Sequence, residues 1–516
     1  MNNKIYLIII AIFSVSINQF FANKGIFPID SFLNFDSAYN VTRGFHPFKD
    51  YWLITGPLLD YIQSFFFITF GISWFTYVLH ASIINMFFAL FSFYFFLKIG
   101  LKNYYAFIYS IGVAILAYPS IGTPFIDHHA VILSLMAFYS FSLGVLLKKN
   151  IYWFITPFFL IFSFLSKQIP SSYLLIFFVI IIFIYFISKN SNKKNLIYFF
   201  VGSLLSLFLI AMVFYINEIP YKNFLIQYIY YPASLGDERI SELNINLKNL
   251  VLQFKFIYFA LLPLILCFFF IIIKDKQNFF NKDEFIILLL FLCSVLIIVY
   301  CQLITRNQIL IFFIIPIISA LAHAYSEKFF NKKYLIYFIL VIFIFSTGKY
   351  HIRFNQNKKF IELSNVNFDL SEDADQLDVK LKGLKWITPH YPNRPLYEIN
   401  LLKEVKNILL EKKNRKIIVT DYQFFSSLLN NDFASPNKWY DDLSIPDKKN
   451  KHYNEYKSFF FEKILNSKIE YIYFIGTKKN KIDFFQEFKQ NNKCVVSQKI
   501  NELLFEYNIN NCKQIL

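Results

Sequence analysis

Two basic residues, Lys167 and Arg306, are the first candidates for chemistry in this sequence. Each lies in a very short connection between apolar segments, and the third short connection of that set, 118–124, holds no cation. A cation at the translocated edge of a membrane span costs free energy and usually has an anionic partner. Arginine binds phosphate as a bidentate fork and lysine as a point charge, so the two residues predict a phosphate site. The alternative is that both side chains extend to the phosphates of outer-leaflet lipids.

A long aromatic loop, residues 27–63, carries the second set of candidates. Aromatic rings pack on the apolar face of a sugar and carboxylates bind its hydroxyl groups, so acids among aromatic residues suit a sugar substrate. The alternative for Asp36 is an acid that only faces solvent, and Asp50 is expected to act in structure or binding rather than in catalysis. The loop contains the acids Asp30, Asp36, Asp50 and Asp60.

Three polar residues, Asp127, His128 and His129, open the fourth apolar segment. Aspartate and histidine ligate metals such as Zn²⁺ and Mn²⁺. Adjacent residues on a helix point about 100° apart, so both histidines cannot easily serve one ion. The interpretation favoured here places Asp127 and His128 on the wall of a substrate cavity. Whether a divalent metal ion takes part stays open.

Apolar helices are the elements that would position these residues. Hydrophobic residues make up 56% of the 516, with 68 Phe and 35 Tyr. Runs of about 18 or more apolar residues recur, and each is long enough to cross a bilayer as a helix. The pattern predicts an α-helical polytopic membrane protein with about 11 transmembrane helices. The expected spans are residues 5–22, 72–97, 104–118, 125–147, 151–166, 171–188, 196–216, 252–273, 285–304, 307–324 and 334–348.

Lysine divides the connections between these spans into two sets. One set is lysine-rich, whereas the opposite short loops hold only Lys167 and Arg306. Because Lys and Arg accumulate in cytoplasmic loops, we expect the N-terminus inside a plasma (inner) membrane. The loops 23–71 and 217–251 and everything after about 349 are then outside. This orientation accounts for much of the net charge of +17, so no nucleic-acid partner is expected. The first span is interpreted as an anchor rather than a cleaved signal peptide.

The polar tail, residues 350–516, is predicted to form an extracytoplasmic α/β domain after a transmembrane domain of residues 1–349. It contains no glycine-rich nucleotide-binding motif. The sequence does not determine whether its two cysteines, Cys494 and Cys512, form a disulfide. Two segments have the pattern of buried strands and two have helical periodicity: 415–420 and 469–475, then 398–413 and 481–490.

The second long outer loop, 217–251, is rich in tyrosine. It is expected to cover the active site, to bind the acceptor, or to serve as a purely structural lid. The sequence favours none of these alternatives.

The first outer loop resembles the GT-C superfamily, polytopic glycosyltransferases that take sugar from a polyprenyl-phosphate carrier. The nearest likeness is to bacterial members related to protein mannosyltransferases and to the lipid A aminoarabinose transferase. Their pattern is an Asp after the first span, then a Tyr, a Gly, an aromatic stretch with another Asp, and a Pro. This chain has Asp36, Tyr39, Gly44, Asp50 and Pro57 in that order.

Two further segments are similar to that superfamily. The turn at residues 166–170 resembles its short outer Lys-containing turn, and Arg306 leads into an apolar run with a proline, residues 312–322. There are departures: Ser37 follows Asp36 where many relatives have a second acid, and Thr55-Gly56-Pro57 replaces Lys-Pro-Pro. The superfamily is therefore better supported than any particular subfamily or sugar.

The resemblance implies transfer of a sugar from a polyprenyl-phosphate donor to a cell-envelope glycan, lipid or protein on the outer membrane face. Asp36 would orient or deprotonate the attacking hydroxyl group. The departing lipid phosphate needs fixed cations or a metal, a role that suits Lys167 and Arg306. Tyr39, Asp50, Asp127 and His128 would line the substrate site. The resemblance assigns no definite cofactor and does not decide whether a divalent metal ion takes part.

Two other functions compete with this one. An O-antigen polymerase or ligase also handles polyprenyl-linked glycans, but such enzymes typically place their large polar region between spans rather than at the C-terminus. A transporter or flippase of lipid-linked sugars often has internal repeats and Gly/Pro-broken spans. No internal repeat is evident in this sequence.

Overall fold

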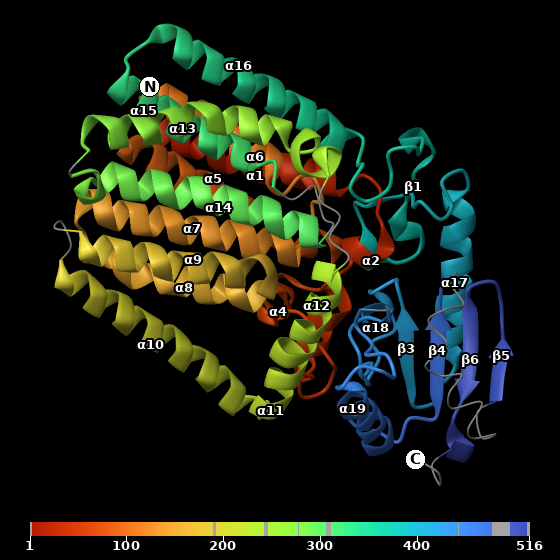
Figure 1. Cartoon of the computed structure of the whole chain (residues 1–516). Coiled ribbons are helices and arrows are strands. Elements are labelled where there is room, and N and C mark those ends of the chain that lie inside the picture. The colour runs from red at the N-terminus through yellow and green to blue at the C-terminus, as the bar shows by residue number, and fades with distance from the viewer. Residues whose placement is uncertain are drawn as a thin grey trace. The chain divides into compact units, whose positions relative to one another are not determined.

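The computed structural model describes residues 3–188, 192–241, 246–276, 278–305, 311–441, 443–476 and 496–512. The chain forms two compact units, each assembled from three separate stretches (Figure 1). The helical unit comprises Met1–Ala22, Ala81–Met212 and Arg239–Phe360. The mixed unit comprises Asn23–His80, Val213–Glu238 and Ile361–Leu516. Each unit is described below by itself.

A helix overlaps each segment predicted as a membrane span, although α15 begins seven residues after the start of the predicted span 307–324. Eight helices of the described residues are long and apolar enough to cross a membrane. The apolar helices α6 and α8 are shorter, and α15 has 16 residues, so the total of 11 crossings stays a prediction. The helices are α1 (Asn3–Ala22), α5 (Trp74–Lys98), α6 (Asn103–Leu116), α7 (Ile126–Leu147), α8 (Asn150–Ser166), α9 (Gln168–Ile187), α10 (Lys193–Ile216), α13 (Lys255–Lys274), α14 (Asp283–Thr305), α15 (Ile314–Phe329) and α16 (Lys333–Tyr350).

Polar side chains join helices inside the helical unit. On α1, Asn18 donates hydrogen bonds to Ser82 Oγ at 2.9 Å and to the carbonyl of Gly122 at 3.0 Å. On α5, Asn85 donates to backbone carbonyls of α1 and α6 at 3.1 and 3.0 Å. Apolar burial does not distinguish a neighbouring helix from a lipid tail, so such bonds help to specify helix–helix contacts.

A four-stranded sheet forms the centre of the tail in the mixed unit. Its order is β3-β4-β6-β5, with β3 and β4 parallel and the other pairs antiparallel. The predicted strands 415–420 and 469–475 correspond to β3 (Lys416–Thr420) and β4 (Tyr471–Ile475). The predicted helix 398–413 corresponds to α17 (Pro395–Glu411), whereas 481–490 lies outside the described residues. The remaining strands of this sheet are β5 (Val496–Lys499) and β6 (Leu504–Asn508).

The two long loops fold together with this tail. Trp52 of the first loop packs on Tyr231 of the second and on Tyr456 and Phe459 of α19 (Tyr453–Asn466), with ring centroids 6.1, 5.1 and 5.8 Å apart. All four belong to one buried cluster. Segments that share a core lie on the same side of any membrane that the apolar helices cross. The lysine pattern independently assigns all three segments to one side.

The first loop is more helical than the sequence indicated. Residues 23–71 were interpreted as an outer loop, but they contain α2 (Pro28–Ser31), α3 (Phe35–Thr42) and the 13-residue apolar helix α4 (Leu58–Phe70). The short helix α3 carries Asp36 and Tyr39, and α4 carries Asp60. Fixed helices, rather than a flexible connection, therefore position these residues.

Candidate active site in the mixed unit

Asp36 lies in the first turn of α3 and is only 6% exposed. Its carboxylate binds α18 (Phe425–Leu428), accepting hydrogen bonds from the backbone N–H groups of Ser426 and Ser427, both at 3.0 Å. The first N–H groups of a helix have no partner within it and usually bind an N-cap side chain. The N-cap residue here, Phe424, has no side chain that can do this. Asp36 supplies the missing cap from a distant part of the chain.

A reciprocal backbone bond fixes this arrangement. The N–H group of Asp36 donates to the carbonyl of Gln423 at 2.9 Å. Asp36 therefore has a structural role, with a typical value of about 1 kcal/mol for a cap. Each carboxylate oxygen has a second lone pair, so this cap still leaves capacity to accept a proton.

Burial raises the pKa of Asp36 from 3.8 to about 7. Removal from water is the largest cause, because it disfavours the charged form. The hydrogen bonds from Ser426 and Ser427 and the positive charge of Lys380 act in the opposite direction. A carboxyl group with a pKa near the working pH is suited to general acid–base catalysis.

A second buried acid, Asp60 on α4, is held differently. Its Oδ1 lies 2.6 Å from the ammonium group of Lys438, and neither side chain is more than 1% exposed. Asp60 also accepts hydrogen bonds from Ser37 Oγ at 2.7 Å and Tyr51 Oη at 3.0 Å. Lys438 donates a further bond to Asn34 Oδ1 at 2.8 Å. Burial lowers the pKa of Lys438, and the charge of Asp60 opposes that shift.

Asp36 and Lys438 both line a small cavity of about 20 Å³. Such a volume holds about one water molecule or hydroxyl group, and it is too small for a sugar ring. The cavity is polar, and Asn437 Oδ1 has no hydrogen-bond partner among the described residues. The lining residues include Asp36, Ser37, Tyr51, Asn437, Lys438 and Tyr440.

Two other predicted residues of this loop, Tyr39 and Asp50, have different surroundings. The Tyr39 hydroxyl is buried and has no hydrogen-bond partner among the described residues. Asp50 accepts the backbone N–H of His46 at 2.7 Å, while its own N–H donates to the His46 carbonyl at 2.8 Å. Asp50 thus closes a local turn, and it is not among the residues lining the cavity.

Lys167 and Asp127 bind each other in the helical unit. The Lys167 ammonium group lies 2.7 Å from both carboxylate oxygens of Asp127, which is 3% exposed against 20% for the lysine. The anionic partner expected for Lys167 is thus another predicted binding residue. A pair of opposite charges attracts a phosphate less than a free lysine does, so a phosphate would compete with Asp127 for Lys167.

His128 and His129 are fully buried near these residues in the helical unit. His129 hydrogen-bonds to the Tyr118 hydroxyl, and His128 Nε2 lies 3.3 Å from Ser120 Oγ. His128 Nδ1 has no hydrogen-bond partner in the described parts of the chain. The described residues contain no group of three or more His, Cys, Asp and Glu arranged to hold a metal ion.

Not every predicted residue can be placed in one site. Arg306 lies outside the described residues. Asp36, Tyr39 and Asp50 belong to the mixed unit, whereas Lys167, Asp127 and His128 belong to the helical unit. Among the tail cysteines, Cys512 is disulfide-bonded, and Cys494 lies outside the described residues.

The sequence did not indicate the tail residues that hold Asp36 and Asp60. Ser426 and Ser427 act through backbone groups, which carry no residue-type signal. Lysine is rarely buried unless it is paired, so nothing distinguished Lys438 from the many surface lysines. A sequence separation of 378 residues divides it from Asp60.

Comparison with known proteins does not assign a family. No protein-family model matches the chain, and no curated protein matches it.

Proposed function

We propose that this chain is an integral-membrane glycosyltransferase that takes sugar from a polyprenyl-phosphate donor. The acceptor would be a cell-envelope glycan, lipid or protein on the outer face of the membrane. The observation that carries the proposal is the buried Asp36, whose pKa is raised to about 7 and which borders a cavity that fits one hydroxyl group. The likeness of the first loop to GT-C enzymes supports the same residue.

Asp36 would accept the proton of the attacking hydroxyl group as it displaces the lipid phosphate from the anomeric carbon. Tyr39 and Asp50 would support the loop around it. Lys167 and Arg306 would stabilise the negative charge on the departing phosphate, and Asp127 would hold Lys167 in place before the donor arrives. His128 would line the donor cavity. If a divalent metal ion binds, it would add positive charge at the phosphate.

The side of the membrane also belongs to this proposal. The lysine pattern favours a periplasmic or extracellular position for the mixed unit. The disulfide-bonded Cys512 supports it, because disulfides persist in oxidising compartments outside the cytoplasm.

Cells that lack the gene provide the first test. Lipid-linked sugars and envelope glycans would be compared by mass spectrometry in cells with the parental gene, no gene, or an Asp36→Asn gene. We expect one lipid-linked sugar to accumulate and one glycan modification to disappear in the last two strains. Unchanged glycans and lipid-linked sugars in the strain without the gene would contradict the proposal.

A further inference from the structure

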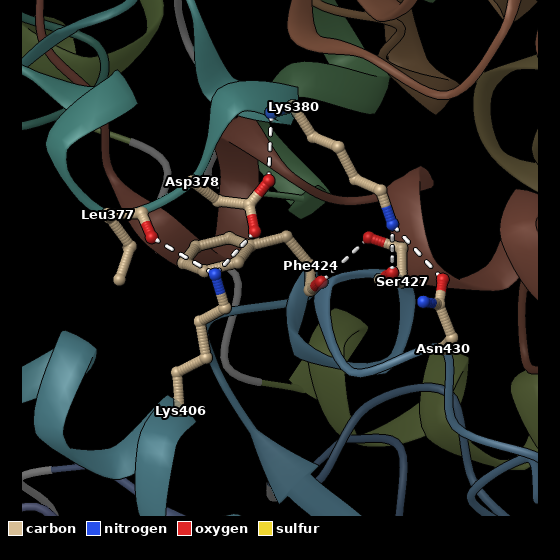
Figure 2. Close-up of polar contacts among 7 residues, drawn as sticks. All are labelled: Leu377, Asp378, Lys380, Lys406, Phe424, Ser427 and Asn430. Atoms are coloured by element: carbon tan, nitrogen blue, oxygen red, sulfur yellow. Dashed lines mark hydrogen bonds and ion pairs between the residues drawn. The ribbon is translucent and has the colours of Figure 1, made fainter. Parts of the chain in front are cut away.

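The short helix α18 (Phe425–Leu428) has an acid at one end and a base at the other. Asp36 binds the backbone N–H groups of Ser426 and Ser427, as described above. At the opposite end, the ammonium group of Lys380 donates to the carbonyl of Ser427 and, at 3.2 Å, to Asn430 Oδ1 (Figure 2). Helix amides favour negative charge at the N-terminus and positive charge at the C-terminus, so both contacts stabilise the helix.

Lys380 is held in place by its own segment. It lies in the 3-10 helix η7 (Val379–Leu381), whose N-cap residue Asp378 accepts the Lys380 backbone N–H at 2.8 Å. The α18 segment ends with Asn430 in a left-handed conformation at φ +47°, and the N–H of Asn431 donates to the Ser426 carbonyl at 2.9 Å. This closure is the usual way in which a helix ends at Asn or Gly. Both partners of the Lys380 contact are therefore fixed by local structure.

We propose that Lys380 is a positioning residue for Asp36: by binding the carboxyl end of α18, it holds the two amides that bind the Asp36 carboxylate. Lys380 also places a positive charge near that carboxylate. The electrostatic interaction is mutual, since each charge favours the charged form of the other. The catalytic meaning of this inference rests on the proposed function, but the coupling itself does not.

The other charged and titratable groups around Asp36 are few among the described residues. Tyr39 lies on the same helix and interacts electrostatically with Asp36. Tyr51, Tyr440 and Lys438 line the same cavity, and Lys438 is paired with Asp60. Lys380 is the only cation among the main causes of the Asp36 pKa shift.

A neighbouring lysine provides a matched control. Lys406 binds Asp378 Oδ2 at 2.6 Å and the carbonyl of Leu377 at 3.3 Å (Figure 2). Its substitution by Met removes a positive charge from the same cluster, and neither of these two hydrogen-bond partners belongs to α18. A specific role of Lys380 therefore predicts different results for Lys380→Met and Lys406→Met.

The pH dependence of thermal unfolding tests the coupling without any assay of sugar transfer. The pKa of Asp36 is higher in the folded chain (about 7) than its ordinary value of 3.8. The folded state therefore binds this proton more tightly. The resulting stability is complete below about pH 4 and is lost as pH rises to about 7. Subtracting the Asp36→Asn profile from the parental profile isolates this contribution.

Full-length protein in lipid nanodiscs would be compared as the parental chain, Lys380→Met, Lys380→Arg, Lys406→Met and Asp36→Asn. Loss of the Lys380 charge should move the upper end of the Asp36 transition to higher pH by about half a unit or more, a threefold change in proton affinity. Lys380→Arg and Lys406→Met should keep the parental midpoint. If Lys380→Met does not fold, Lys380→Gln removes the charge but keeps a donor for Ser427.

The outcomes separate this inference from the proposed function. If the Asp36 transition in Lys380→Met has the same midpoint pH as in the parental chain, the positioning role is wrong. The same holds if Lys406→Met shifts this midpoint as much as Lys380→Met does. In a transfer assay, the pH midpoint should shift in Lys380→Met while the KM for donor stays unchanged. If the unfolding profiles behave as expected but the parental protein transfers no sugar, the coupling stands and the glycosyltransferase proposal fails.

Discussion

In the mixed unit, two backbone N–H groups bind the carboxylate of Asp36. In the helical unit, the ammonium group of Lys167 binds the carboxylate of Asp127. Asp36 accepts two backbone N–H groups and has no direct salt bridge among the described residues, so burial raises its pKa to about 7. Asp127 instead binds Lys167 through both oxygens. Each carboxylate oxygen of Asp127 lies 2.7 Å from the Lys167 ammonium group. Under the proposed function, Asp36 accepts the proton in the mixed unit, and Asp127 holds Lys167 in the helical unit.

The largest expected effect concerns the location of the mixed unit. We expect a reporter that is active only outside the cytoplasm to be fully active when fused after Leu516. The reason is that loop 23–71 and the first part of loop 217–251, up to Glu238, share a unit with the tail from Ile361. The lysine pattern predicts that these segments are outside. The control is the same reporter fused in a lysine-rich connection, such as after Lys149, which should be inactive. The reverse result would place the proposed chemistry on the wrong side of the membrane.

Two buried acids of the mixed unit, Asp36 and Glu398, should respond differently when each is replaced by its amide. Asp36→Asn should reduce the transfer rate by about 10²–10⁴-fold, the usual value of general-base catalysis. Asn also places an amide donor against one of the two N–H groups of α18, so folding must be checked.

Glu398 provides the matched control for Asp36. It is fully buried, its pKa is raised by burial, and it accepts hydrogen bonds from Trp386, Thr388 and Tyr422. Glu398→Gln should keep transfer activity once the amount of folded protein is equalised. Loss of transfer in Glu398→Gln and its retention in Asp36→Asn would reverse the assignment.

The buried pair in the mixed unit should act mainly on stability. Lys438→Met leaves Asp60 charged and buried without its cation, which should cost about 3–5 kcal/mol. The variant that combines Asp60→Asn with Lys438→Met should recover much of this loss, because no unpaired charge remains. Chemical unfolding of full-length protein measures both changes. Equal stability of Lys438→Met and the parental chain would show that this pair does not hold α4 to the tail.

The smallest effect is expected for the charge pair of the helical unit. Lys167→Met should raise the KM for the lipid donor roughly tenfold, as for loss of one charged hydrogen bond. Asp127→Asn should lower that KM, because it removes the carboxylate that competes with phosphate. If neither variant changes the KM, the lysine serves only membrane anchoring. Opposite directions in the two variants would distinguish phosphate binding from a purely structural salt bridge.

The predictability of the molecule from its sequence differs between the two units. Long apolar runs predict helices, and each expected span overlaps a helix. Eight helices of the described residues are long and apolar enough to cross a membrane. Strands β3 and β4 were also predictable, because short apolar runs, three residues in β3 and five in β4, suit a buried strand. The helix α4 was not predicted, since its 13 residues lie within an aromatic loop and are too few to cross a bilayer.

The sequence predicted only part of the candidate site. Asp36 was selected through likeness to a family pattern, but its surroundings depend on contacts with residues 390 and 391 positions away. A single sequence contains no signal for such pairs. The interpretation of Asp36 as an acid facing solvent is wrong, because it is 6% exposed.

The most direct test of the central claim is the transfer rate of the parental protein as a function of pH, with a polyprenyl-phosphate sugar donor in nanodiscs. A base must be unprotonated to act, and burial raises the pKa of Asp36 to about 7. We therefore predict a rate that rises about tenfold per pH unit below that value and is constant above it. No transfer at any pH, or a rate that does not change between about pH 5 and 8, would contradict the account.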